Sequence, residues 1–262
     1  MTSRISLNLV TIRPAPLEAK LHAASTAGFR AVGLLWEEMA EQREAGMEEV
    51  RLSGLAVSEI AAIRGWADPD RTSRRVAMAR AAQACEMAAN IGCGLVVAHP
   101  TPGEFEPFSA AGDFQELCRL AQPFRVKVGL EFIGNSRQIN TLAAAWEIVD
   151  LADAENGGLV VDTFHFFRGG STLEMLEPVP GGKVYLVQVS DCMELPRHEM
   201  ENRHRVYPGT GVFPLEPLIA ALREKSYSGY YSLELHNEEY WQESPLVVAR
   251  EGLRAMRRLD LR

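Results

Sequence analysis

Short apolar runs recur along the chain, and most are followed by a segment whose apolar residues have helical spacing. The run Leu159-Val160-Val161 shows no polar alternation, which is typical of a parallel strand buried on both faces. Such runs predict eight strands, at about residues 5–12, 31–36, 55–63, 95–98, 126–132, 159–162, 184–189 and 230–235. Helices are predicted between them at about residues 16–28, 44–52, 72–89, 110–124, 141–152, 172–176, 215–224 and 245–259.

The alternation of strand and helix predicts an α/β fold with a parallel sheet and right-handed crossovers. Eight repeats in 262 residues favour closure into a (β/α)8 TIM barrel, and an open doubly wound sheet is the alternative. No linker or low-complexity tract marks a second domain, so we expect one domain over residues 1–262. Two segments interrupt the pattern: a loop rich in Pro and Gly at 101–107, and a long polar segment at 191–211.

Four successive predicted strands each end at an oxygen-bearing side chain: Glu131, Asp162, Gln188 and Glu234. In a barrel these strand ends share one face, so we expect the four side chains to converge. Three converging carboxylates repel one another, and a bound divalent cation removes that conflict. Oxygen donors favour Mn²⁺ or Mg²⁺, with Co²⁺ and Zn²⁺ as further options. The alternative is that each residue is a solvated side chain or an ion-pair partner.

Other polar residues near the strand ends are candidates for contact with a substrate. His165 follows Asp162 by three residues and can act in proton transfer, or it is a loop histidine bonded to a neighbour. Arg205 can grip a substrate carboxylate or hydroxyl, although most surface arginines have no such role. His99 and Trp36 are candidate walls of the pocket, and Trp36 equally suits packing.

Composition and charge exclude several classes of partner. The chain is 47% hydrophobic and 24% charged, as in globular proteins. A net charge of −8 argues against nucleic acid, whose binding depends on clustered Lys and Arg. No apolar run is long enough to span a membrane, and no apolar signal region precedes the first strand. The four cysteines form no CxxC pair, so we expect reduced thiols and a cytoplasmic location.

Motifs of several other enzyme classes are missing from the sequence. There is no GxxxxGK[ST] motif, no GxGxxG opening a helix and no GxSxG elbow. The turn at residues 208–211 fits a phosphate-binding loop only loosely, so we infer no phosphorylated substrate.

Residues 129–132, 160–165, 188–191, 204–211 and 232–235 resemble the sugar isomerase/epimerase superfamily of xylose-isomerase-like TIM barrels. The resemblance is specific between about residues 125 and 245, and it is strongest to members of the inosose isomerase type and the 3-dehydroshikimate dehydratase type. It implies metal ligands at Glu131, Asp162, Gln188 and Glu234. It also implies that His165 and Arg205 contact the substrate.

The resemblance further implies a divalent-metal-dependent isomerase or epimerase that works through an enediolate intermediate. Its substrate would be a sugar, an inosose or a related polyhydroxy ketone. Glu131 and Glu234 would be the base and the acid, and His165 would polarise a substrate oxygen. Relatives of this barrel often pair, so a homodimer is an expectation.

Gln188 departs from the isomerase pattern, as does the apolar segment 212–214 where relatives often have an acidic residue. Many isomerase relatives have His where this chain has Gln188, and the dehydratases have Gln there. The alternative function is therefore a metal-dependent lyase of the 3-dehydroshikimate dehydratase type, with His165 as the base. A non-catalytic sugar-binding barrel is the third hypothesis.

Overall fold

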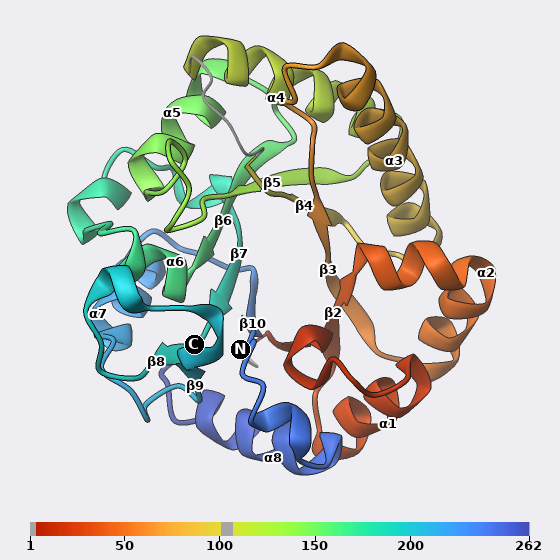
Figure 1. The fold of residues 1–262 in the computed structure, drawn as a ribbon, viewed down its shortest axis with the longest axis vertical. Helices are drawn as coiled ribbons and strands as arrows, with labels where there is room; N and C mark the ends of the chain where they lie inside the picture. Colours follow the sequence, from red (N-terminus) through yellow and green to blue (C-terminus); the bar gives the residue numbers. More distant parts are fainter. Residues whose placement is uncertain (1–3, 101–106, 262) are drawn as a thin grey trace.

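The computed structural model describes residues 4–100 and 107–261, and within them eight parallel strands close into a barrel (Figure 1). The first strand pairs with both the second and the last, which closes the sheet. The predicted (β/α)8 fold is therefore confirmed. The barrel strands are β1 (Ile5–Asn8), β2 (Ala31–Leu35), β3 (Ala56–Ile63), β4 (Leu95–Ala98), β5 (Lys127–Glu131), β6 (Gly157–Asp162), β7 (Val184–Val189) and β10 (Tyr230–Leu233).

Helices surround the barrel on its outside (Figure 1). They are α1 (Leu17–Ala27), α2 (Trp36–Ser53), α3 (Arg71–Asn90), α4 (Pro107–Ala121), α5 (Leu142–Ala152), α6 (Thr163–Arg168), α7 (Leu215–Glu224) and α8 (Pro245–Met256). Short 3-10 helices occur at η1 (Leu9–Ile12), η2 (Gln122–Phe124), η3 (Leu173–Leu176), η4 (Gly181–Lys183), η5 (Arg197–Glu199), η6 (Asn202–His204) and η7 (Tyr240–Gln242). None of the helices formed by the described residues is long and apolar enough to cross a membrane.

Three segments differ from their predicted form. The helix predicted at 44–52 is the second part of α2, which begins at Trp36 and kinks at Arg43, where φ is 50° and ψ is −123°. Helix α6 was not predicted; it follows β6 directly because Asp162 accepts hydrogen bonds from its first N–H groups. The polar segment at 191–211 contains a two-stranded antiparallel ribbon of β8 (Asp191–Cys192) and β9 (Arg205–Val206). Of the loop predicted at 101–107, residues 101–106 lie outside the described residues.

The interior of the barrel has an apolar part and a polar part. Side chains of β3, β4, β6 and β7 form a cluster of their own, made of Ala61, Ala62, Leu95, Val97, Val160 and Leu186. Strands β1, β3 and β10 contribute buried polar side chains instead: Ser6, Asn8, Glu59 and Ser232. A buried polar group is costly unless it is hydrogen-bonded, so the polar part needs an explanation that packing alone does not give.

Candidate functional site

The ends of four strands bring oxygen-bearing side chains to one place. Glu131 is the last residue of β5 and Asp162 is the last residue of β6. Gln188 lies opposite Asp162 in the register of β6 and β7, and Glu234 directly follows β10. All four side chains are buried. The convergence expected from the strand ends is therefore what the fold produces.

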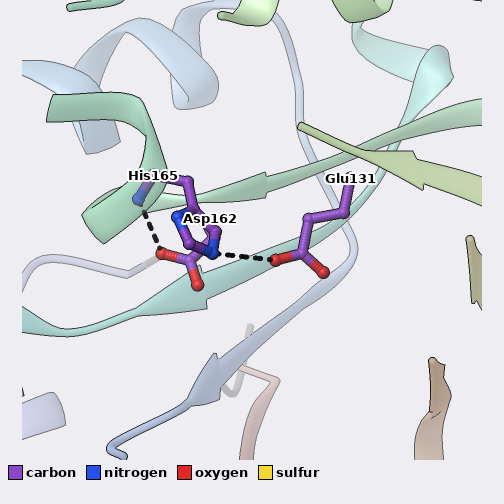
Figure 2. A group of neighbouring side chains, drawn as sticks. All are labelled: Glu131, Asp162 and His165. Carbon is purple, nitrogen blue, oxygen red and sulfur yellow. Dashed lines mark hydrogen bonds and ion pairs between the residues drawn. The ribbon is translucent and has the colours of Figure 1, made fainter. Parts of the chain in front are cut away.

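Figure 2 shows the part of this cluster formed by Glu131, Asp162 and His165. One potential ligand atom from each residue lies within 4.8 Å of the others, and all three residues are buried. Asp162 Oδ1 accepts the backbone N–H groups of Phe164 (2.6 Å) and His165 (3.2 Å), so this carboxylate caps α6. The cap fixes the turn from strand to helix and leaves Oδ2 of Asp162 for the site.

Arg205 is the cation of the cluster in the described part of the chain. Its Nη1 donates to Asp162 Oδ2 at 2.7 Å and to Glu234 Oε2 at 3.3 Å, and its guanidinium lies 4.5 Å from the ring centre of Phe164. Burial alone lowers the pKa of Arg205, but the two carboxylates raise it above its usual value. For Asp162 the signs are reversed: burial raises the pKa of the carboxyl group, but Arg205 and His165 hold it below its usual value. Asp162 and Arg205 are therefore a charged, buried pair.

Asp191 holds the segment that delivers Arg205. Its Oδ2 accepts the N–H groups of Gly209 and Gly211, both at 3.0 Å, and its Oδ1 accepts that of Phe213 at 2.9 Å. Pairing of β8 with β9 then places Arg205 opposite Cys192. The glycine N–H groups that loosely resembled a phosphate-binding turn are thus already bonded to a carboxylate of the chain itself.

Glu234 receives donors on both of its oxygens. Oε1 accepts the side-chain amides of Asn8 (2.9 Å) and Gln188 (2.8 Å), and Oε2 faces Arg205. Burial raises the pKa of Glu234 well above its usual value, although Arg205 opposes this. One guanidinium therefore does not supply enough positive charge for this carboxylate.

His165 and His99 lie on either side of Glu131. His99 Nε2 is 2.9 Å from Glu131 Oε2, and His165 Nε2 is 3.8 Å from Glu131 Oε1. The N–H of Gly134 donates to His165 Nδ1 at 3.3 Å, and Arg205 Nη2 lies 3.4 Å from Nε2, so a donor faces each ring nitrogen. Burial, aided by the charge of Arg205, lowers the pKa of His165 to about 4 although Asp162 raises it. At neutral pH His165 is therefore uncharged, and its Nε2 faces the site.

The donor set fits a divalent cation. Glu131, Asp162 and Glu234 bring three carboxylates, and Arg205 offsets only one of them. Gln188 Oε1 is buried and has no hydrogen-bond partner among the described residues, so a carbonyl oxygen is available as a ligand. A divalent ion would supply the missing positive charge. These residues form a candidate site for a divalent metal.

A cavity of about 630 Å³ opens above the cluster. Glu131, His165, Arg205, Glu234 and His99 line it, which places these predicted site residues in a pocket large enough for a small polyol. Asp162 and Gln188 are not among the lining residues and are almost inaccessible, as expected for groups that face a metal rather than a substrate. Trp36 packs in the hydrophobic core, and its predicted contact with a substrate stays a prediction.

Comparison with known proteins agrees with the barrel fold. A family model described as xylose isomerase-like TIM barrel matches residues 21–259. The chain belongs to this family.

Two curated relatives in this family carry enzyme names. The inosose isomerase of Halalkalibacterium halodurans is 40% identical over 128 residues, which is 48% of this chain and 45% of that protein. The 3-dehydroshikimate dehydratase of Pseudomonas aeruginosa is 29% identical over 256 residues, which is 93% of this chain and 40% of that protein. Both alignments span less than half of the relative's length.

A solved barrel has nearly the same fold. The crystal structure of IOLI protein with a binding zinc atom has a TM-score of 0.90 and 24% identity, and the match covers 97% of this chain and 96% of that one. At this identity the likeness shows the shared xylose isomerase-like fold.

Three polar residues of this family member escaped the sequence analysis. Asn8 contacts Glu234 of the cluster from inside the barrel, Glu59 contacts Asn8, and Asp191 holds the segment that carries Arg205. Glu59 had a detectable signal, because it is a carboxylate in the middle of a strand that is apolar apart from Ser58. Asn8 had a weaker one, as a polar residue that ends β1.

Proposed function

We propose that this protein is a divalent-metal-dependent isomerase or epimerase of a sugar, an inosose or a related polyhydroxy ketone. The observation that carries the proposal is the order of the strand-end side chains. Glu131 of β5 and Glu234 after β10 flank Asp162 and Gln188, which come from the two barrel strands between them. Two carboxyl groups thus border one candidate metal site, and the name of the inosose isomerase relative agrees with this class of enzyme.

We assign Glu131, Asp162, Gln188 and Glu234 as the ligands of one metal ion. An all-oxygen set of this kind favours Mn²⁺ or Mg²⁺ over Zn²⁺, with Co²⁺ as a further option. When bound, a divalent ion supplies the positive charge that acidifies the carbon beside a carbonyl and stabilises an enediolate.

The side chains of the protein move the protons in this proposal. Glu131 removes a proton from that carbon, and His99 keeps its carboxylate oriented. Glu234 returns a proton to the neighbouring carbon for isomerisation, or to the opposite face of the same carbon for epimerisation. His165 polarises a substrate oxygen, and Arg205 binds a hydroxyl. A positioned acid or base contributes roughly 10²–10⁴-fold in rate.

Exchange of carbon-bound hydrogen with solvent tests the proposal. The metal-loaded protein is incubated in deuterated buffer with inosose and a panel of ketoses, and the products are followed by NMR. We expect deuterium at the carbon beside the carbonyl, and we expect chelation or Glu131→Gln to abolish it. If no member of the panel takes up label, the isomerase proposal fails.

A dehydratase is the second candidate, and three observations favour it. Gln188 matches the residue type expected of the 3-dehydroshikimate dehydratases, and the alignment with the Pseudomonas aeruginosa enzyme covers most of this chain. Arg13 and Arg168 also line the cavity without an ion pair to any described carboxylate, which suits an acidic substrate. An ultraviolet assay on 3-dehydroshikimate tests this candidate, because loss of water creates an aromatic product. An unchanged spectrum rules that substrate out.

We also propose that the chain acts as one domain and pairs as a homodimer. Analytical ultracentrifugation is expected to give twice the 29.0 kDa mass of the chain. A sedimenting species of the monomer mass at micromolar concentration would contradict the pairing.

A further inference from the structure

Glu59 is a buried carboxyl group that takes no part in the proposed chemistry. It lies in the middle of β3, is fully buried, and is not among the residues that line the cavity. Its register partner on β2 is Gly33, and a Cβ atom at that position would collide with the Glu59 carboxylate. The glycine therefore leaves the space through which Glu59 reaches past β2 toward β1 and β10.

The Glu59 carboxylate accepts hydrogen bonds from one side chain of β1 and one side chain of β10. Oε1 accepts Ser232 Oγ at 2.9 Å and Asn8 Nδ2 at 3.2 Å. The same Asn8 Nδ2 donates to Glu234 Oε1 at 2.9 Å. An amide nitrogen carries two protons, so one goes to each carboxyl group. Asn8 Oδ1 accepts a hydrogen bond from the N–H of Val10 at 3.1 Å. This bond fixes which end of the Asn8 side-chain amide faces the two carboxyl groups.

This arrangement decides which oxygen of Glu234 remains for the site. Oε1 is held by the amides of Asn8 and Gln188, whereas Oε2 is directed at Arg205. A ligand carboxylate whose orientation is fixed by outer partners binds a metal more tightly than one that must first be ordered.

We propose that Glu59 is a positioning residue, which acts through Asn8 to fix the orientation of Glu234 and thereby sets the affinity of the site for a divalent cation. The inference rests on the proposed metal site. A purely structural role explains the arrangement less well, because an apolar side chain would fill the same space without the cost of burying a carboxyl group. That cost is visible in the pKa of Glu59, which burial raises to about 7.

The test is the dissociation constant for Mn²⁺, measured by electron paramagnetic resonance on the full chain. Glu59→Leu removes the acceptor that orients Asn8, and we expect affinity to fall by about 10-fold, the lower end of the effect of losing a group bonded directly to a ligand. Glu59→Gln keeps the carbonyl oxygen that accepts from Asn8 and Ser232, and we expect affinity close to wild type. Two serine variants form a matched pair for the same measurement. Ser232→Ala loses a hydrogen bond to Glu59, and Ser6→Ala is its control.

Ser6 is a suitable control because it lies opposite Ser232 in the β1–β10 register, is fully buried, and its hydroxyl has no partner among the described residues. We expect weaker binding in Ser232→Ala and unchanged binding in Ser6→Ala. Unchanged Mn²⁺ affinity in folded Glu59→Leu, or in Ser232→Ala should Glu59→Leu not fold, overturns the inference. If Glu59 has only a structural role, its variants should bind Mn²⁺ with unchanged affinity but melt at a lower temperature than wild type in the absence of metal. A wild-type chain that binds no Mn²⁺ instead overturns the proposed function.

Discussion

The two halves of the barrel serve the site in different ways. In β5, β6 and β7 and after β10, the functional side chains stand at the strand ends, where sequence and structure agree on their place. In β1 and β3, Asn8 and Glu59 lie off the cavity: Asn8 contacts Glu234 from inside the barrel, and Glu59 contacts Asn8. The side chains proposed to bind a metal are visible in the sequence, because each is a polar residue that ends an apolar run. The residues that orient them are visible only through contacts between distant segments.

The largest effect is expected from Asp162→Asn. This change leaves the buried Arg205 without its nearest carboxylate and removes a proposed metal ligand. Breaking a buried pair by removing one partner costs about 3–5 kcal/mol, so the free energy of unfolding in urea should fall by that amount. Glu251→Gln, which breaks the exposed pair with Arg254, should cost about 1 kcal/mol or less. Equal losses in the two variants would show that the strand-end half has no special role.

Arg205→Met should reveal how the charge of the site is shared. Without the guanidinium, Asp162 and Glu234 lose their only ion-pair partner of the Arg or Lys type among the described residues, and the pKa of each carboxyl group rises. The metal-free protein should lose about 3–5 kcal/mol of stability. The rise in melting temperature on adding Mn²⁺ should be larger than in wild type, because the cation then offsets more charge. A smaller or equal rise would contradict this account.

Gly33→Ala tests the other half of the barrel. The new methyl group would displace Glu59, and overpacking of this kind costs about 1–3 kcal/mol. Mn²⁺ affinity should fall together with stability, because Glu59 loses its path to Asn8. The control is Gly94→Ala, where a methyl group meets nothing within 4 Å. Equal melting temperatures and equal Mn²⁺ affinities in the two variants would mean that Glu59 does not depend on Gly33.

A dependence of stability on pH is expected from Glu59 as well. The pKa of Glu59 is about 7 in the folded chain against an ordinary 4.5. The folded state therefore holds a proton that the unfolded state releases, and the stabilisation present below pH 4.5 is lost as pH rises to about 7. The slope is at most about 1.4 kcal/mol per pH unit for one proton. The free energy of unfolding in urea, measured across this pH range for metal-free wild type and for Glu59→Gln, isolates this contribution. Parallel pH profiles of the two proteins would exclude it.

The barrel and the strand-end donors were predictable because both depend on local patterns. Apolar runs of four to eight residues mark the strands, and a polar residue marks where each run ends. Helix α6, with six residues, and the two-residue strands β8 and β9 are too short to leave a periodic signal. The contact between Asn8 and Glu234 joins residues 226 positions apart, and no local pattern encodes it.

Residue roles are a further step that neither pattern nor geometry decides alone. Arg205 was expected from the sequence to grip a substrate, and the structure places it against Asp162 and Glu234 as well. Its position beside two proposed ligands depends on Asp191, which folds a segment of irregular sequence back over the site. A reader of the sequence sees the arginine but not the carboxylate that places it.

The most direct measurement is a titration of the metal-free wild-type chain with Mn²⁺. We expect one tightly bound ion per chain and a higher melting temperature on binding. Glu131→Gln should lose both the binding and the rise in melting temperature. A chain that takes up no divalent ion, or whose binding survives in Glu131→Gln with unchanged affinity, would contradict the claim that the strand-end oxygens form the metal site.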